Sequence, residues 1–389
     1  MTRPHWVSIA SVCYVGSAAI AILNGLPAIA ATLKATRRLS NDEIGWLAAA
    51  HLLGLALSSA ACPYILRFLG ARRLLAIGVF MVISGLAVLA MCTSSPLTYG
   101  GFIISGLGTG VANAVICVLL GEYHQERNIS LYYCAQWLST LFLLFFIPKI
   151  VSASGISGVF VCLAIVNVLS ITLLRFVKED YSAMRSVVLE NKGRTLVWIR
   201  SMALLSIGAL FACEGAIWTF LEISGRERGF TAADANAAAT ASPIFGLLGS
   251  LAVIAISRRY GQTVPLVVSA CALGLSLGFL TNARWGIYVS GACLFTFSFS
   301  IFAAYQFGLA TDHDKSGFTA AWASTATCIG FGAGPAIAGA ASEAFGADGV
   351  VGVGVVGAAF AFLLSAILLH RLPGRGQPTN GSLRSRLSG

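Results

Sequence analysis

The chain has 389 residues, of which 57% are hydrophobic and 10% are charged, and its formal net charge is +10. A soluble domain carries about 25% charged residues, so this composition excludes a water-soluble globular protein. The apolar runs reach the roughly 20 residues that cross a bilayer. Because only helices and closed barrels satisfy their own backbone in lipid, and these runs do not alternate as barrel strands do, we expect an all-α membrane protein.

Apolar stretches between charged or Pro- and Gly-containing segments predict twelve transmembrane helices. The first stretch has only Arg3 as its charged flank and is too long for a cleaved signal peptide, so we interpret it as a retained helix. In chain order the expected spans are 7–32, 44–66, 74–92, 97–120, 130–151, 157–176, 198–221, 235–256, 264–281, 286–308, 318–341 and 349–370.

The distribution of Lys and Arg indicates the orientation in the membrane. With the N-terminus inside, the cytoplasmic segments hold 18 of the 25 Lys and Arg residues, and the opposite side holds 7. The positive-inside rule therefore predicts a multi-pass protein of the inner (cytoplasmic) membrane with both termini in the cytoplasm. The net positive charge then reflects topology and requires no nucleic-acid partner.

The longest polar segment divides the chain into two halves. We expect an N-terminal six-helix bundle at 1–177, a cytoplasmic central loop at 178–196, a C-terminal six-helix bundle at 197–371 and a disordered basic tail at 372–389.

The two halves are related by a constant shift of 191 residues, which places Ser40 on Thr231. Each of these hydroxyl residues is predicted to cap a helix, and Asp42 or Asp234 follows shortly after it. The same shift places Arg67 on Arg258 and Gly70 on Gly261, in a basic turn that ends each repeat.

The stretch "PYILRFLGARR", residues 63–73, resembles the loop between helices two and three of the major facilitator superfamily of transporters. Pro63 replaces the family's first Gly and Arg67 stands where its acid is expected, whereas the later Gly and basic residues fit. The resemblance implies two pseudo-symmetric six-helix bundles with helices one, four, seven and ten around a central cavity. It also implies cytoplasmic gate loops at Gly70, Arg72, Arg73, Arg258, Arg259 and Gly261.

Small residues are predicted to bring certain helices close together. The fourth span contains Gly106, Gly108 and Gly110, which resemble the close-packed fourth helix of that family. The Arg that its proton-driven drug exporters carry in this helix corresponds to Phe102. The fifth span lacks the exporters' Gly- and Pro-rich motif, although a similar string, "GFGAGPAIAG", occurs in the eleventh. These departures favour uptake over efflux, and a multidrug or metabolite exporter stays the alternative.

One carboxylate, Glu214, lies in the apolar run "ALFACEGAIWTF". An ionisable residue within a span is expensive to keep and is a functional candidate for that reason. Helical spacing places Phe211, Glu214 and Trp218 on one face. We predict that Glu214 couples transport to protons. The alternatives are a structural pair with His51 or Lys149, or a place in a wet outer vestibule.

The remaining polar residues within spans are candidates for the substrate cavity, and for each of them a helix-to-helix hydrogen bond is the alternative. The candidates are Tyr14, Asn24, His51, Asn113, Gln136, Trp218, Tyr305 and Gln306.

Ten cysteines lie in or at the ends of apolar runs, without a CxxC pair or a His cluster, so we expect no disulfide, metal or cofactor. No Walker-type sequence for ATP is present. The sequence therefore predicts a monomeric secondary transporter that moves a small organic solute with protons by alternating access, and not an enzyme. A membrane-embedded enzyme and a non-transporting sensor are remote alternatives.

Overall fold

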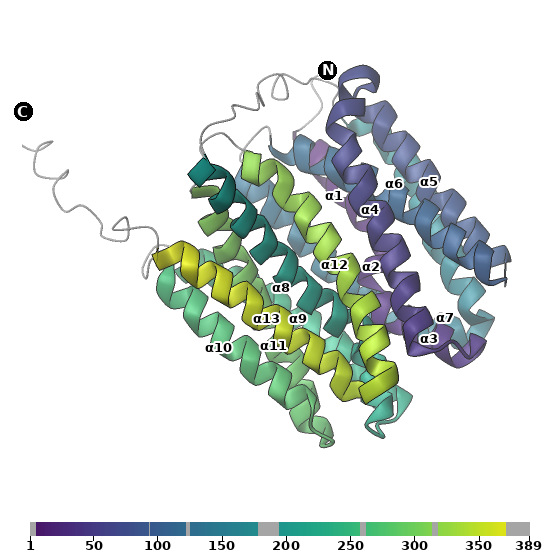
Figure 1. The fold of residues 1–389 in the computed structure, drawn as a ribbon. Helices are drawn as coiled ribbons and strands as arrows, with labels where there is room; N and C mark the ends of the chain where they lie inside the picture. Colours follow the sequence, from purple (N-terminus) through teal and green to yellow (C-terminus); the bar gives the residue numbers. More distant parts are fainter. Residues whose placement is uncertain are drawn as a thin grey trace, which may run out of the picture.

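A computed structural model of the chain describes residues 5–92, 94–121, 125–177, 194–256, 262–312 and 318–370. All regular structure in these ranges is helical, and the helices lie side by side in one bundle (Figure 1). The first half contains α1 (His5–Ala19), α2 (Ala21–Asn24), α3 (Leu26–Arg37), α4 (Asn41–Leu69), α5 (Ala71–Met91), α6 (Ser95–Gly121), α7 (Gln125–Leu173) and the 3₁₀ helix η1 (Leu174–Phe176). The second half contains α8 (Arg194–Glu227), α9 (Ala232–Ile256), α10 (Thr263–Leu280), α11 (Trp285–Asp312), α12 (Phe318–Phe345) and α13 (Ala347–His370).

The first predicted span is not one continuous helix. It is interrupted at Ile20 and again at Gly25, which separate α1, α2 and α3. Pro27 follows the second interruption and has no backbone N–H, so it cannot donate to the carbonyl of Leu23 and continue the preceding helix. A Cβ on Gly25 would lie 2.7 Å from Cδ1 of Ile147 in α7, so a larger residue would require the Ile147 side chain to move.

Two predicted spans are merged in α7. Its 49 residues would extend about 74 Å at 1.5 Å per residue, which is more than twice the thickness of a bilayer core. Gly155 interrupts the helical geometry with φ 68° and ψ −173°. This position lies between the predicted spans 130–151 and 157–176, so α7 contains both of them.

Within the described ranges, nine helices are long and apolar enough to cross a membrane, with α7 counted once. The all-α membrane fold is therefore confirmed. The number twelve requires that α7 be counted twice and that the interrupted α1–α3 and the less apolar α12 be added, so this number stays a prediction.

The caps predicted from the repeat are present at both equivalent helix starts. The Ser40 side chain accepts a hydrogen bond from the Glu43 backbone N–H, and the Glu43 carboxylate accepts one from the Ser40 N–H. Thr231 accepts one from the Asp234 N–H at 3.1 Å. The acid that completes the first cap is thus Glu43 rather than the predicted Asp42.

The predicted glycine contacts are also confirmed, because a Cβ at these positions would overlap a neighbouring backbone. In the first half, Gly106 and Gly110 of α6 lie against the carbonyl groups of His51 and Leu55 in α4. In the second half, α8 and α12 meet where Gly330 lies against the carbonyl group of Gly208. Close backbone approach therefore holds each bundle together, as expected where hydrophobic burial contributes little between helices.

The two halves touch through α4 and α12. A Cβ on Gly45 would overlap the Pro335 carbonyl oxygen, and one on Gly339 would lie 2.6 Å from the Asn41 carbonyl oxygen. Further along α4, Leu57 is 68% exposed and Tyr64 59% exposed. Figure 1 shows the two helices close together at the bottom and further apart toward the top. We call the end where they meet, which holds Lys34, the Lys34 end.

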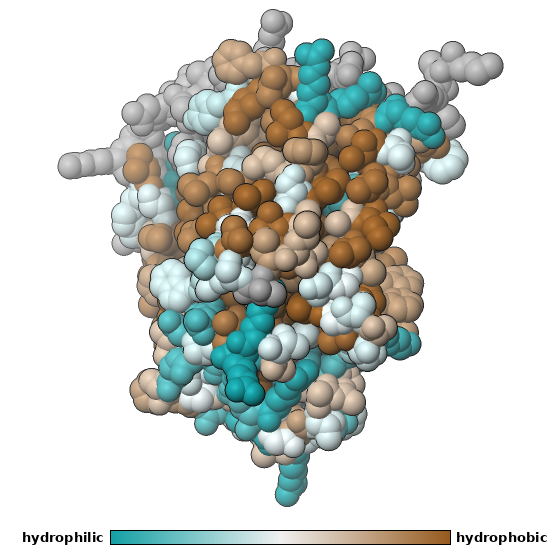
Figure 2. All heavy atoms as spheres, turned by 90° about the vertical axis from the view of Figure 1, so that its right-hand side faces the viewer, coloured by the Kyte–Doolittle hydropathy of each residue, from teal (hydrophilic) through white to brown (hydrophobic). Residues whose placement is uncertain are grey.

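The outer surface of the bundle is apolar over much of its height. Large exposed side chains on the first half include Phe68, Phe80 and Met91. Figure 2 shows hydrophobic residues gathered over the middle and much of the upper part of this face, with hydrophilic residues below and at the upper right edge. This distribution is typical of a protein whose sides contact lipid.

Candidate site between the two bundles

Glu214 lies in α8 on the face that the sequence predicts, between Phe211 and Trp218. Its side chain is half-buried, and no hydrogen bond or ion pair joins its carboxylate to another residue in the described ranges. The ring of Phe211 packs edge-to-face on Phe299 and Phe307 of α11, with centroids 5.3 and 6.0 Å apart. Glu214 is therefore a carboxylate without a fixed partner, beside an aromatic cluster of the second bundle.

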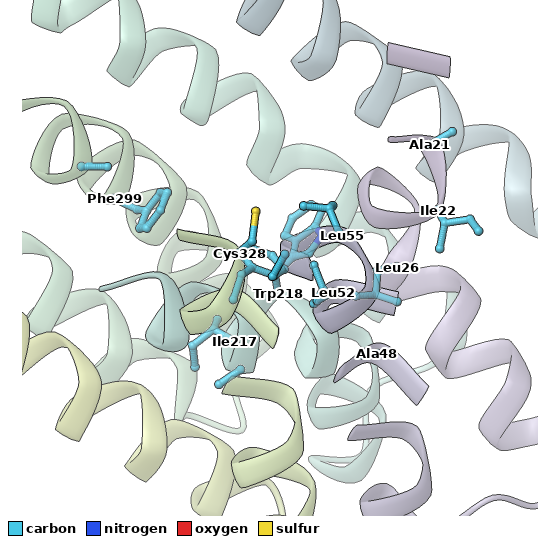
Figure 3. Close-up of a cluster of buried hydrophobic side chains, with 14 of the residues drawn as sticks. Ala21, Ile22, Leu26, Ala48, Leu52, Leu55, Ile217, Trp218, Phe299 and Cys328 are labelled. Atoms are coloured by element: carbon cyan, nitrogen blue, oxygen red, sulfur yellow. The ribbon is translucent and has the colours of Figure 1, made fainter. Parts of the chain in front are cut away.

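Trp218, one turn beyond Glu214, reaches the other half of the molecule. It is 8% exposed, and its indole Nε1–H donates a hydrogen bond of 3.1 Å to the carbonyl oxygen of Leu23 in α2. Figure 3 shows its ring beside Leu52 and Leu55 of α4 and Cys328 of α12. The indole thus fills the space between the bundles on the Lys34 side of Glu214.

A polar network joins the halves at the Lys34 end. Lys34 Nζ contacts Glu227 Oε1 at 2.6 Å, and Asn41 Nδ2 donates to the same oxygen at 2.9 Å. Asn41 Nδ2 also lies 2.7 Å from Ser342 Oγ, and its backbone N–H donates to Glu343 Oε1 at 2.6 Å. We call these five residues the latch; they close this end of the boundary between the bundles.

A second carboxylate lies on the Glu214 face of α8. Glu222 is one turn beyond Trp218, its side chain is 3% exposed, and Oε1 accepts a hydrogen bond from Arg226 Nη2. Its Oε2 atom has no hydrogen-bond partner within the described residues. The sequence analysis missed Glu222 because the predicted span ended at residue 221; its place four residues after Trp218 was the available signal.

The two partners considered for Glu214 are engaged elsewhere. His51 is 1% exposed, and its Nδ1 lies 3.0 Å from Ser105 Oγ and 3.2 Å from the Phe102 carbonyl oxygen, between α4 and α6. Lys149 Nζ lies over the ring of Phe145, 3.8 Å from its centroid. Neither residue forms an ion pair with Glu214 in the structure.

Three candidates of the first half face its own helices or the break in the first span. The Tyr14 hydroxyl donates to the Val166 carbonyl oxygen at 3.2 Å, and Asn113 Oδ1 accepts from the Tyr132 hydroxyl at 3.1 Å. Asn24, next to Leu23, is buried, and its Nδ2 has no hydrogen-bond partner among the residues described.

The other candidates form no hydrogen bond with Glu214 among the described residues. Gln136 is half-buried in α7. In the second half, Gln306 Nε2 donates to Ser206 Oγ at 2.6 Å, so its amide joins α11 to α8. The Tyr305 hydroxyl is buried and has no hydrogen-bond partner in the described ranges. A role of these residues in substrate binding stays a prediction.

The predicted gate loops are described in one half only. Gly70 has φ 70°, where glycine is favoured, between α4 and α5. Arg72 Nη2 donates to the Val177 carbonyl oxygen at 2.5 Å, and Arg73 is exposed. The equivalent residues of the second half, Arg258, Arg259 and Gly261, lie outside the described residues.

Comparison with solved structures finds the same fold in transporters. A structure of a D-xylose-proton symporter has a TM-score of 0.77 and 16% sequence identity, and the match covers 96% of this chain and 98% of that one. A structure of a mutant of the nucleoside transporter NupG has a TM-score of 0.69 and 16% identity, with 93% and 99% covered.

A search of curated protein sequences finds no match. The sequence profile of the Major Facilitator Superfamily, in contrast, matches residues 7–314, most of the length of the chain. The chain therefore belongs to the Major Facilitator Superfamily.

Proposed function

We propose that this protein is a secondary active transporter that moves a small organic solute across the inner membrane by alternating access, with protons coupled through Glu214. Transporters of this fold bind their solutes near the midplane, between the two bundles. The observation that carries the proposal is the state of Glu214, a half-buried carboxylate within a membrane helix that no residue of the described chain neutralises.

An unneutralised carboxylate is costly within a membrane. The cost falls when a proton or a cationic group reaches the carboxylate, and it returns when that group leaves. Solute transport is coupled to proton movement if the protein changes between its two open states only when the carboxylate is neutralised. Glu214 has no fixed cation to do this permanently, so a mobile proton is the group that we assign to it.

The closed Lys34 end supports an alternating-access cycle. With both termini in the cytoplasm, this end faces outward, and the latch together with Trp218 separates Glu214 from the outer solution. The state described here is then closed to the outside. Opening outward requires the Lys34–Glu227 ion pair and the Trp218–Leu23 hydrogen bond to break.

We propose that the protein takes up its solute together with protons. We also propose that it acts as a monomer. The departures from the exporter motifs at Phe102 and in the fifth span favour it. One structural neighbour is a D-xylose-proton symporter and another is a nucleoside transporter, so hydroxylated solutes are the first class to test. Efflux of a drug or metabolite is the second candidate.

The test uses purified protein in liposomes with an imposed proton gradient. Uptake of labelled D-xylose and uridine, and export of a lipophilic dye, are measured for the wild type, Glu214→Gln and Asp348→Asn. The last variant removes a carboxylate that is 69% exposed and pairs with Arg228 within the second bundle, away from Glu214, and it is the matched control. We expect Glu214→Gln to lose accumulation but to keep exchange of solute without a gradient. Accumulation at the wild-type level in Glu214→Gln would contradict the coupling role.

A further inference from the structure

The hydrogen bond between Trp218 and Leu23 has a cause in the sequence of the other bundle. In a helix, the carbonyl group of residue 23 is bonded to the N–H of residue 27. Residue 27 is Pro, which has no N–H, so the Leu23 carbonyl is left without its intrahelical donor. The indole Nε1–H of Trp218 donates to this carbonyl oxygen at 3.1 Å, and the backbone N–H of Gly25, two residues further on, is also directed at it.

The bond lies in an apolar setting between the two halves. Trp218 is 8% exposed, and Leu52, Leu55 and Cys328 lie beside its ring (Figure 3). A buried carbonyl or N–H that loses its partner without reaching water or another polar group is destabilised. The indole and the Leu23 carbonyl therefore favour the arrangement in which the bundles touch at this level.

We infer that Trp218 is a positioning residue of the transport cycle, which holds the Lys34 end closed by supplying the hydrogen-bond donor that Pro27 denies to Leu23. The inference rests on the proposed alternating access and adds to it one hydrogen bond that stabilises the closed state. Separation of the bundles at the Lys34 end breaks this hydrogen bond and exposes the indole N–H and the Leu23 carbonyl to the pathway. The latch and Trp218 then form two successive barriers on the same side of Glu214.

The inference is tested with two substitutions that act on opposite sides of one bond. Trp218→Phe removes the donor and keeps an aromatic ring. Pro27→Ala gives the Leu23 carbonyl an N–H from its own helix, so that it no longer depends on the indole. Trp285→Phe is the matched control, because the Trp285 indole donates to the Asp234 carbonyl oxygen inside the second bundle, at 3.2 Å.

The measurement is hydrogen exchange of the backbone amides of α12 from Gly339 to Phe345, in the full-length purified protein without solute. These amides lie beside α4 at the Lys34 end, so opening of that end raises their exchange. We expect Trp218→Phe to raise the open population roughly two- to tenfold, which is what the loss of one net hydrogen bond produces. Pro27→Ala is expected to raise it by less, and Trp285→Phe to leave it unchanged.

The double variant decides whether the two residues act through one bond. If they do, Pro27→Ala adds little or nothing to Trp218→Phe, because the carbonyl left without a partner then receives a donor from its own helix. Effects that simply add, or unchanged exchange in Trp218→Phe, would overturn the inference. If Trp218→Phe does not fold, Pro27→Ala alone decides, and unchanged α12 exchange in that variant overturns it. None of these outcomes depends on proton coupling, so they stand apart from the Glu214→Gln test.

Discussion

Glu214 and Glu222 lie on the same face of α8, eight residues or about 12 Å apart, yet their surroundings differ. Glu222 is buried and paired with Arg226 one turn away, so a cation of the fold stands beside it. Glu214 is half-buried and has no such partner in the described ranges. The comparison separates a carboxylate that has a cation built beside it from one that has none, and only the second is free to take up the mobile proton that we propose for Glu214.

The largest effect on stability is expected from removal of the cation beside Glu222. Arg226→Ala leaves a buried carboxylate without its ion partner, and we expect a loss of about 3 kcal/mol in the free energy of unfolding, near the low end for such pairs because Arg226 is 33% exposed. Thermal unfolding in detergent measures this loss. The exposed Arg284→Ala is the control and should change stability by less than about 0.5 kcal/mol.

The combined variant Glu222→Gln with Arg226→Gln sharpens the comparison. Because it removes both charges at once, it should recover most of the stability that Arg226→Ala loses. Equal melting temperatures for Arg226→Ala and Arg284→Ala would show that Glu222 does not need a fixed partner, and the distinction between the two carboxylates would fail.

The sequence predicted local features well and contacts between the halves poorly. Glu214 was found because it stands alone in an apolar run, and the glycine contacts of α6 were found because small residues recur within one helix. Glu222 was missed because an acidic residue close to Arg226 and Arg228 is typical of the start of a loop. The latch was also missed, since Lys34 and Glu227 lie 193 residues apart and only the fold brings them together.

Within one bundle, too, the hydrogen-bond partners of polar residues could not be predicted from the sequence. Gln306 was a candidate for the cavity or for a hydrogen bond between helices; its amide donates to Ser206, which is 100 residues away in sequence, and no local pattern reveals that pairing. The interruption of the first span had a visible signal, Pro27, whose missing N–H makes a break more probable than a continuous helix. The all-helical membrane class was therefore predictable from composition and spacing, and the two-bundle arrangement from the family resemblance, whereas the partners of each polar side chain were not.

Substitutions at two glycines distinguish packing inside a bundle from packing between the bundles. Gly106→Ala places a methyl group against the His51 carbonyl group inside the first bundle, and we expect a loss of about 2 kcal/mol in unfolding free energy. Gly45→Ala places one against Pro335 across the boundary between the halves. It should leave the stability of each bundle unchanged and raise hydrogen exchange at the Lys34 end. Equal loss of thermal stability in both variants would contradict this separation.

A smaller effect is expected at Gln306, whose amide donates to Ser206 and lies 3.4 Å from Ser365. Gln306→Leu should cost about 1 kcal/mol of unfolding free energy, as hydrogen bonds between membrane helices do. If this bond is all that Gln306 contributes, the KM for solute stays at the wild-type value. Asn24→Ala is the comparison, because its Nδ2 has no hydrogen-bond partner among the residues that the structure describes. A higher KM in Gln306→Leu would instead indicate that this residue contributes to solute binding.

The smallest effect is expected at the ion pair of the latch. Lys34 and Glu227 have side chains 31% and 27% exposed, and such pairs contribute about 0.2–1 kcal/mol, reduced further by salt. Lys34→Gln should therefore raise exchange of the Asn41–Trp46 amides only slightly at low ionic strength, and the difference from wild type should vanish in high salt. Asn41→Ala is the contrast, since Asn41 is buried and its amide bonds both Glu227 and Ser342 across the boundary. Its effect should exceed that of Lys34→Gln and persist in salt. A larger, salt-sensitive effect of Lys34→Gln would mean that charge, and not the buried hydrogen bonds beneath it, keeps this end closed.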